Sequence, residues 1–274
     1  MKRLFVSILV CMMMLSGCTV EEKEPPKTLR LTTTTSVNDS GLLEYLRPYI
    51  LEEANINLEI VSLGSGAALE AGKRGDADAL LVHSPAAEKT FVDEGYGVKR
   101  STFMYNFFVI VGPSSDPAQV KDLSAADAFK KIESAKSQFI SRGDNSGTHS
   151  KEKAIWKLAG LDVEVVSADT SFYVSAGSGM GATLTMASEK QAYTLTDLAT
   201  FLSMKAQLSL NVIVSESPDL RNDYSIIVIN PDKVANVDDE TAKAFEAWMI
   251  SDRALKLIAE YGKDTYGETL FFTE

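Results

Sequence analysis

The chain has 274 residues, a net charge of −11, two cysteines and two histidines. The acidic excess argues against a nucleic-acid partner, because binding to phosphates requires clustered Lys and Arg side chains. The histidines lie far apart in the sequence and the cysteines are few, so the sequence predicts no zinc site, no other metal and no cofactor. The length is sufficient for two lobes or one large domain.

The N-terminal segment has the pattern of an exported lipoprotein. A short basic start is followed by an apolar run of 11 residues, 4–14, which is too short to span a bilayer as a stable anchor. The tetrapeptide Leu15-Ser16-Gly17-Cys18 resembles a bacterial lipobox, which implies a lipid anchor at Cys18. We therefore expect a signal peptide at 1–17 and a flexible tether at 18–27, and removal of the two basic residues takes the net charge from −11 to −13. An ordinary signal peptide with a chance cysteine is the alternative.

Hydrophobic periodicity after the tether predicts alternating strands and helices. Strands are expected at 28–34, 57–63, 78–82, 103–111, 138–140, 163–166, 210–214 and 224–229. Helices are expected at 42–51, with Ser40 as N-cap and a kink or break at Pro48, and at 64–71, 85–94, 124–134, 146–158, 179–189, 196–206 and 239–261. This alternation predicts an α/β protein with mostly parallel sheets.

The pattern also predicts two lobes. The break at 112–115, Gly-Pro-Ser-Ser, suggests a crossover into a second lobe, and Asn222-Asp223 suggests the return. We expect residues 28–111 and 224–274 to form lobe 1 and residues 112–223 to form lobe 2. Two α/β lobes joined by two strands place a ligand in the cleft between them.

The most informative stretch is 141–152, Ser-Arg-Gly-Asp-Asn-Ser-Gly-Thr-His-Ser-Lys-Glu, between a predicted strand and a predicted helix. A helix start offers free backbone N–H groups, and the Arg142 guanidinium offers a planar fork of donors, so the stretch favours binding of an oxyanion. A surface pair between Arg142 and Asp144 is the alternative. A hydrolase with Ser146 as nucleophile and His149 as base is a remote one, because no Gly-x-Ser-x-Gly elbow is present and capping by Ser146 is the simpler role.

Three further loops carry donors at predicted strand ends or helix starts. The segment 32–36 places Thr34 and Ser36 on one face of the strand end, with Thr35 at the turn; Gly64-Ser65-Gly66 opens a helix, and 177–183 brings Thr183 to another. Each loop alone could be an ordinary turn. Together the neutral and cationic donors favour a fully deprotonated tetrahedral dianion, while Asp144 leaves a protonated phosphate open, since a protonated ligand needs an acceptor.

Several of these stretches together resemble the tungstate-binding lipoproteins of tungstate ABC importers: 33–36, 64–66, Arg74-Gly75-Asp76-Ala77-Asp78, Met104-Tyr105-Asn106, 141–149 and 179–183. The resemblance implies a type II periplasmic-binding-protein fold, capture of tungstate and delivery to a membrane permease by a monomer that is not an enzyme. It implies an oxyanion pocket built from Thr34, Thr35, Ser36, Ser65, Arg142, Ser146, Gly147, Thr148 and Thr183. Phosphate or molybdate receptors of the same fold, and a sensor that reports the same anion to a signalling partner, are the alternatives.

Overall fold

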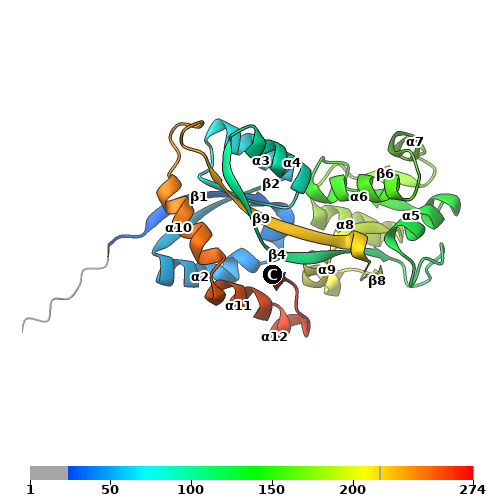
Figure 1. The fold of residues 1–274 in the computed structure, drawn as a ribbon. Helices are drawn as coiled ribbons and strands as arrows, with labels where there is room; N and C mark the ends of the chain where they lie inside the picture. The colour runs from blue at the N-terminus through cyan, green and yellow to red at the C-terminus, as the bar shows by residue number, and fades with distance from the viewer. Residues whose placement is uncertain (1–23, 216, 274) are drawn as a thin grey trace, which may run out of the picture.

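The computed structural model describes residues 24–215 and 217–273 (Figure 1). The predicted signal peptide and the lipidation site at Cys18 lie outside this range. The helices are α1 (Thr35–Asp39), α2 (Leu42–Ala54), α3 (Ser65–Arg74), α4 (Pro85–Asp93), α5 (Ala125–Ser134), α6 (Gly147–Leu158), α7 (Val163–Ala168), α8 (Met180–Lys190), α9 (Leu198–Met204), α10 (Asp239–Met249), α11 (Asp252–Glu260) and α12 (Lys263–Tyr266). The strands are β1 (Lys27–Thr34), β2 (Ile56–Leu63), β3 (Ala79–Val82), β4 (Gly97–Gly112), β5 (Phe139–Ser141), β6 (Tyr173–Ser175), β7 (Thr194–Asp197), β8 (Asn211–Val214), β9 (Arg221–Ile229) and β10 (Phe272–Thr273). Within the described part of the chain, no helix is long and apolar enough to cross a membrane.

The main sheet is mixed, so the expectation of mostly parallel sheets is wrong. Its strands run in the order β10-β4-β9-β3-β1-β2, and only β2 and β3 pair with β1 in parallel. β9 lies antiparallel to both β3 and β4. The cause is the path of the chain. β9 returns from the far end of the molecule and inserts between β3 and β4, which both run in the opposite direction.

Two groups of helices and strands lie side by side, and β4 and β9 run between them (Figure 1). β4 pairs with β9 as far as Phe107 and with β7 from Phe108 onward, so one strand serves both groups. The smaller sheet of β5 and β6 belongs to the second group, beside α5, α6 and α8. We refer to the two groups as the lobes, and the boundaries given above stay predictions.

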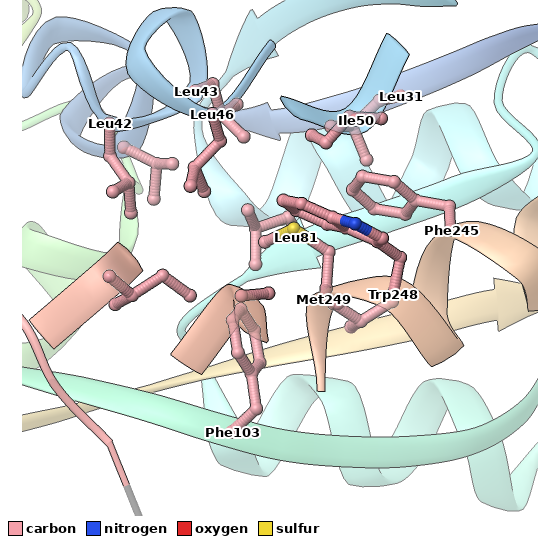
Figure 2. Packing of buried hydrophobic residues seen from close by; sticks show 14 of the residues in the cluster. Leu31, Leu42, Leu43, Leu46, Ile50, Leu81, Phe103, Phe245, Trp248 and Met249 are labelled. Carbon is pink, nitrogen blue, oxygen red and sulfur yellow. The ribbon is translucent and has the colours of Figure 1, made fainter. Parts of the chain in front are cut away.

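Alternation along β3 divides the first lobe into two layers. Ala79 and Leu81 pack with α2 and α10 on one face of the sheet, whereas Leu80 and Val82 pack with α3 and Phe91 of α4 on the other. Figure 2 shows the first layer, in which leucines of α2 face Phe245, Trp248 and Met249 of α10. Burial of these side chains holds the helices against the sheet. The first two donor loops follow the ends of two of its strands, β1 and β2.

Several local predictions need correction. Residues 163–166 are helical within α7, because the Asp162 side chain caps the segment by accepting from the Glu164 N–H. The single helix expected at 239–261 is two helices, since Ser251 caps α11 in the same way. α2 continues through Pro48, and its N-cap is Gly41 in the left-handed region rather than Ser40. The helix expected at 196–206 begins only after the short strand β7.

Candidate functional site

Four helix starts follow the predicted donor loops. The Thr34 side chain caps α1 and the Ser146 side chain caps α6, each by accepting a backbone N–H of the first turn. α3 and α8 begin after Gly64 and Gly179, and neither has a side-chain cap. Helix starts of this kind leave backbone N–H groups free for a ligand and carry the positive end of the helix dipole.

The loops of the two lobes meet directly. A Cβ placed on Gly64 would lie 3.5 Å from the Ser146 Cα, so the start of α3 contacts the start of α6. The Arg142 Nη2 donates to the Thr35 Oγ1 across the same gap at 3.3 Å. α8 contacts α1 as well. The structure therefore brings all four predicted donor loops together where the two lobes meet, and we refer to this place as the cleft.

Several buried donors at this cleft lack partners. Within residues 24–215 and 217–273, the buried side-chain atoms without a hydrogen-bond partner are Ser65 Oγ, Asn106 Nδ2, Arg142 Nε and Thr148 Oγ1. Three of the four belong to the residues predicted to bind the oxyanion. Leaving a buried donor unpaired costs about 1–3 kcal/mol, so their convergence indicates a place where a bound ligand supplies the acceptors.

Arg142 is buried, with 3% of its side chain exposed, and its main ionic partner is Asp144 at 2.5 Å. The other oxygen of Asp144 accepts from the Ser146 N–H at 3.1 Å. The Arg142–Asp144 pair thus exists, but its guanidinium is buried and its carboxylate is only partly exposed, so it is not a solvated surface pair. Both carboxylate oxygens are engaged within their own loop, which leaves the Arg142 Nε as the free donor of the pair.

The remaining predicted residues differ in their availability. Ser36 Oγ lies 3.2 Å from Thr34 Oγ1 and 3.1 Å from His83 Nε2, so it belongs to a buried polar network. Gly147 lies against Ser65 and His83, and no larger residue fits there without movement. The Thr183 hydroxyl donates to the Gly179 carbonyl oxygen at 3.0 Å, so it is already committed within its own helix start.

Sequence reasoning missed the network behind Ser36. His83 follows β3, and its Nδ1 lies 2.9 Å from the Asn222 Oδ1. The Asn222 Nδ2 donates to Asn106 Oδ1 at 3.0 Å and to the Tyr224 hydroxyl at 2.8 Å. Burial lowers the pKa of His83 to about 4, with Arg142 and Lys151 acting in the same direction, so the ring is neutral near pH 7. Asn106 belongs to the stretch Met104-Tyr105-Asn106 named above, but no local sequence pattern links it to His83, which lies 23 positions earlier.

A second buried group lies behind the Arg142 loop. Glu152 on α6 accepts from the Tyr173 hydroxyl at 2.8 Å and from the Trp156 Nε1 at 3.3 Å. Burial raises the pKa of Glu152 to about 7, although hydrogen bonds from Ser141, Tyr173 and Trp156 oppose the shift. The carboxyl group therefore ties α6 to β6 through Tyr173 and to Ser141, the last residue of β5, which precedes Arg142.

The geometry gives no support to a catalytic Ser146–His149 pair. The Ser146 Oγ accepts from the His149 backbone N–H as an N-cap, and the His149 Nδ1 accepts from the Asn145 N–H at 3.0 Å. The capping role predicted for Ser146 is therefore confirmed. Among the described residues, no group of three or more His, Cys, Asp or Glu side chains could hold a metal ion.

Comparison with known proteins identifies the family. A family model described as a PBP superfamily domain matches residues 19–253. The tungstate-binding protein TupA of Peptoclostridium acidaminophilum is 48% identical over 285 residues, which covers 99% of this chain and 98% of that protein. The chain belongs to the PBP superfamily and to its TupA family.

Solved structures of TupA-family relatives have the same fold. The tungstate-binding protein TupA from Desulfovibrio alaskensis G20 matches with a TM-score of 0.78 at 40% identity, covering 90% of this chain and 99% of that one. A structure of the tungstate ABC transporter from Geobacter sulfurreducens matches with a TM-score of 0.78 at 42% identity, covering 85% of this chain and 98% of that one. The predicted type II periplasmic-binding-protein fold is confirmed.

Proposed function

We propose that this chain captures tungstate, or a very similar tetrahedral oxyanion, in the cleft between its lobes and delivers it to the permease of an ABC importer. The observation that carries the proposal is the set of unpartnered buried donors, Ser65 Oγ, Arg142 Nε and Thr148 Oγ1, beside uncapped helix starts. The TupA relatives, which are named as tungstate-binding proteins, support the choice of ligand.

The state of the carboxylates favours a fully deprotonated dianion over a protonated phosphate. A protonated phosphate needs an acceptor for its O–H group. Asp144 already accepts from Arg142 and from Ser146. Asp197 is a second carboxylate whose charge interacts with that of Arg142. It accepts from the Thr200 N–H and hydroxyl at 2.9 and 2.8 Å. Each of these four carboxylate oxygens therefore already accepts one hydrogen bond, whereas tungstate and molybdate need donors alone, which the unpartnered hydroxyls and the Arg142 Nε would supply.

The sequence features of the N-terminus support the place of action. A signal peptide at 1–17 and lipidation at Cys18 would hold the protein, as a monomer, on the extracytoplasmic face of the cell membrane. The segment between Cys18 and β1 would then tether a binding unit within reach of its permease. In this arrangement no chemical step is required of the protein, because capture and release of the anion are sufficient.

Titration calorimetry of the purified protein with tungstate, molybdate, sulfate and phosphate tests the ligand. We expect tight binding of tungstate, and weak or no binding of sulfate and phosphate; the molybdate titration decides whether the cleft separates the two dianions of nearly equal size. Binding of phosphate alone would transfer the proposal to that anion. Failure to bind any of the four would refute the oxyanion site.

The variant Thr148→Val tests the location of the site. It removes the unpartnered hydroxyl and keeps a side chain of similar shape, so we expect an approximately tenfold or greater loss of tungstate affinity, since a hydrogen bond to a charged group contributes about 1.5–3 kcal/mol. Thr185→Val is the matched control, because the Thr185 hydroxyl bonds to the Gly181 carbonyl oxygen on the exposed face of α8. An unchanged affinity in Thr148→Val would place the ligand elsewhere.

A further inference from the structure

A buried chain of hydrogen bonds leads from the cleft to the two strands that join the lobes. Ser36 contacts the His83 Nε2, the His83 Nδ1 contacts Asn222, and Asn222 contacts Asn106. Asn106 on β4 and Asn222 on β9 are direct register partners. His83 thus stands between a predicted ligand residue and the pair of strands on which the lobes meet.

With the Asn222 amide oriented as it is found, these hydrogen bonds determine the tautomer of His83. The Asn222 Nδ2 donates to Asn106 and Tyr224, so the Asn222 Oδ1 faces the His83 ring and Nδ1 must carry the hydrogen. A neutral ring then has a bare Nε2, which accepts the hydroxyl proton of Ser36. In this arrangement Ser36 has no proton to donate to an oxyanion.

The same arrangement leaves one donor unsatisfied. The Asn106 side chain is fully buried, and its Nδ2 is one of the atoms without a partner. If the amides of Asn222 and Asn106 both turned over, Asn106 would donate to the Asn222 oxygen and Asn222 would donate to the His83 Nδ1. The ring would then carry its hydrogen on Nε2 and donate to the Ser36 oxygen. Within each amide the nitrogen and the oxygen would exchange places, and the Tyr224 hydroxyl would donate to the Asn222 oxygen.

A bound dianion favours this second arrangement. If the Ser36 hydroxyl turned to the anion while the ring kept its hydrogen on Nδ1, two bare lone pairs would face each other at 3.1 Å inside the protein. Buried unpaired acceptors of this kind are costly. The second arrangement removes the conflict and gives the anion the Ser36 proton.

We propose that His83 is a positioning residue whose tautomer changes when the oxyanion binds: the ring hydrogen moves from Nδ1 to Nε2, the amides of Asn222 and Asn106 turn over, and the Ser36 hydroxyl is released to the anion. The proton lost from Nδ1 goes to water and Nε2 takes one from water, so the ring stays neutral throughout. A cavity of about 350 Å³ lined by His83, Lys151 and Asn222 gives water access to the ring. Burial and the charges of Arg142 and Lys151 lower the pKa of His83, so the doubly protonated ring does not form near pH 7.

Nitrogen-15 NMR of the histidine rings reads the tautomer directly. The chain has only two histidines, so protein prepared without a polyhistidine tag gives two ring systems. His149 is an internal reference, because its Nδ1 accepts from the Asn145 N–H and its hydrogen must lie on Nε2. We expect one Nδ1–H ring and one Nε2–H ring without ligand, and two Nε2–H rings with saturating tungstate; His149→Gln assigns the signals.

The inference rests on the proposed function, and the experiment separates the two. If calorimetry shows no oxyanion binding, the proposed function fails and this inference with it. If tungstate binds and His83 keeps its hydrogen on Nδ1, or already carries it on Nε2 without ligand, only the tautomer change is refuted.

A double-mutant cycle tests whether His83 acts through Ser36. We expect His83→Leu and Ser36→Ala each to weaken tungstate binding by about 10- to 100-fold, and the double variant to be no weaker than Ser36→Ala alone. His83→Gln, whose amide can donate to Ser36, should recover most of the affinity. Additive losses in the double variant would refute the positioning role, and the NMR experiment on the unaltered protein holds even if a variant fails to fold.

Discussion

Substitution of Gly147 by alanine provides a sharp test of the closed cleft. Gly147 opens α6, and a Cβ there would lie 2.6 Å from the His83 Cε1 and 2.9 Å from both His83 Nδ1 and Ser65 Oγ. His83 is hydrogen-bonded on both ring nitrogens and cannot yield, so α6 must move away from the other lobe. Carbon atoms in contact are normally about 3.5 Å apart, which requires a displacement of roughly 0.9 Å.

That displacement is sufficient to break hydrogen bonds across the cleft. A donor at about 2.9 Å from the anion would be left at about 3.8 Å, beyond hydrogen-bond range. Loss of two such bonds to a charged ligand costs about 3–6 kcal/mol, so affinity should fall by roughly two to four orders of magnitude. Folding should not suffer, because Gly147 has no positive φ and alanine favours a helix more than glycine does.

Calorimetry with tungstate and thermal unfolding without ligand measure these two effects separately. We expect Gly147→Ala to bind far more weakly while its unfolding temperature is unchanged or slightly higher. Gly66→Ala is the matched control at the opposite helix start, because the nearest atom to its Cβ is the Asn145 carbonyl oxygen at 3.9 Å. Wild-type affinity in Gly147→Ala would show that the anion does not bind while the two lobes keep the contact described above.

Three other substitutions separate ligand binding, pH dependence and core stability. Arg142→Ala should weaken tungstate binding by at least about 100-fold in calorimetry, because it removes the unpartnered Nε and leaves the Asp144 carboxylate without its cation beside the anion. The pKa of Glu152 is raised by burial from 4.5 to about 7, so its contribution to stability is fully present below pH 4.5 and is lost as the pH rises through 7. The excess stability of the wild type over Glu152→Gln in urea unfolding should therefore fall by roughly 3 kcal/mol between pH 4.5 and 8, and a constant difference would contradict the raised pKa. Phe245→Ala in the fully buried layer of Figure 2 should cost about 3–5 kcal/mol in urea unfolding and leave the tungstate affinity of the folded protein unchanged.

The donor loops could be predicted because their chemistry is local. Ser146 as an N-cap, Gly64 before a helix and the polar end of β1 are features of a few adjacent residues, and the structure confirms each of these elements. Their meeting in one cleft followed from the rule that ligands bind at the carboxyl ends of strands in open α/β sheets. The cross-lobe contact of Arg142 with Thr35 is the structural result of that rule.

The His83 network and the mixed sheet could not be predicted in the same way. The pairing of Asn106 with Asn222 depends on the register of two strands more than 100 residues apart, and no local pattern encodes it. The error at α7 has a simpler cause, since Val163-Glu164-Val165-Val166 reads as a β-branched strand until the cap at Asp162 is taken into account. Tertiary contact and capping outweighed intrinsic preference at these places.

The electrostatics of the cleft explain how an acidic protein can bind a dianion. Arg142 is the cation of the site, yet Asp144 at 2.5 Å offsets most of its field. The attraction must then come mainly from backbone N–H groups at helix starts and from hydroxyls, which are fixed dipoles with no net charge. Dipoles bind an anion only when their hydrogens point at it. In the proposed mechanism, the direction of each proton, including that of Ser36 through His83, would therefore determine which ligand the cleft accepts.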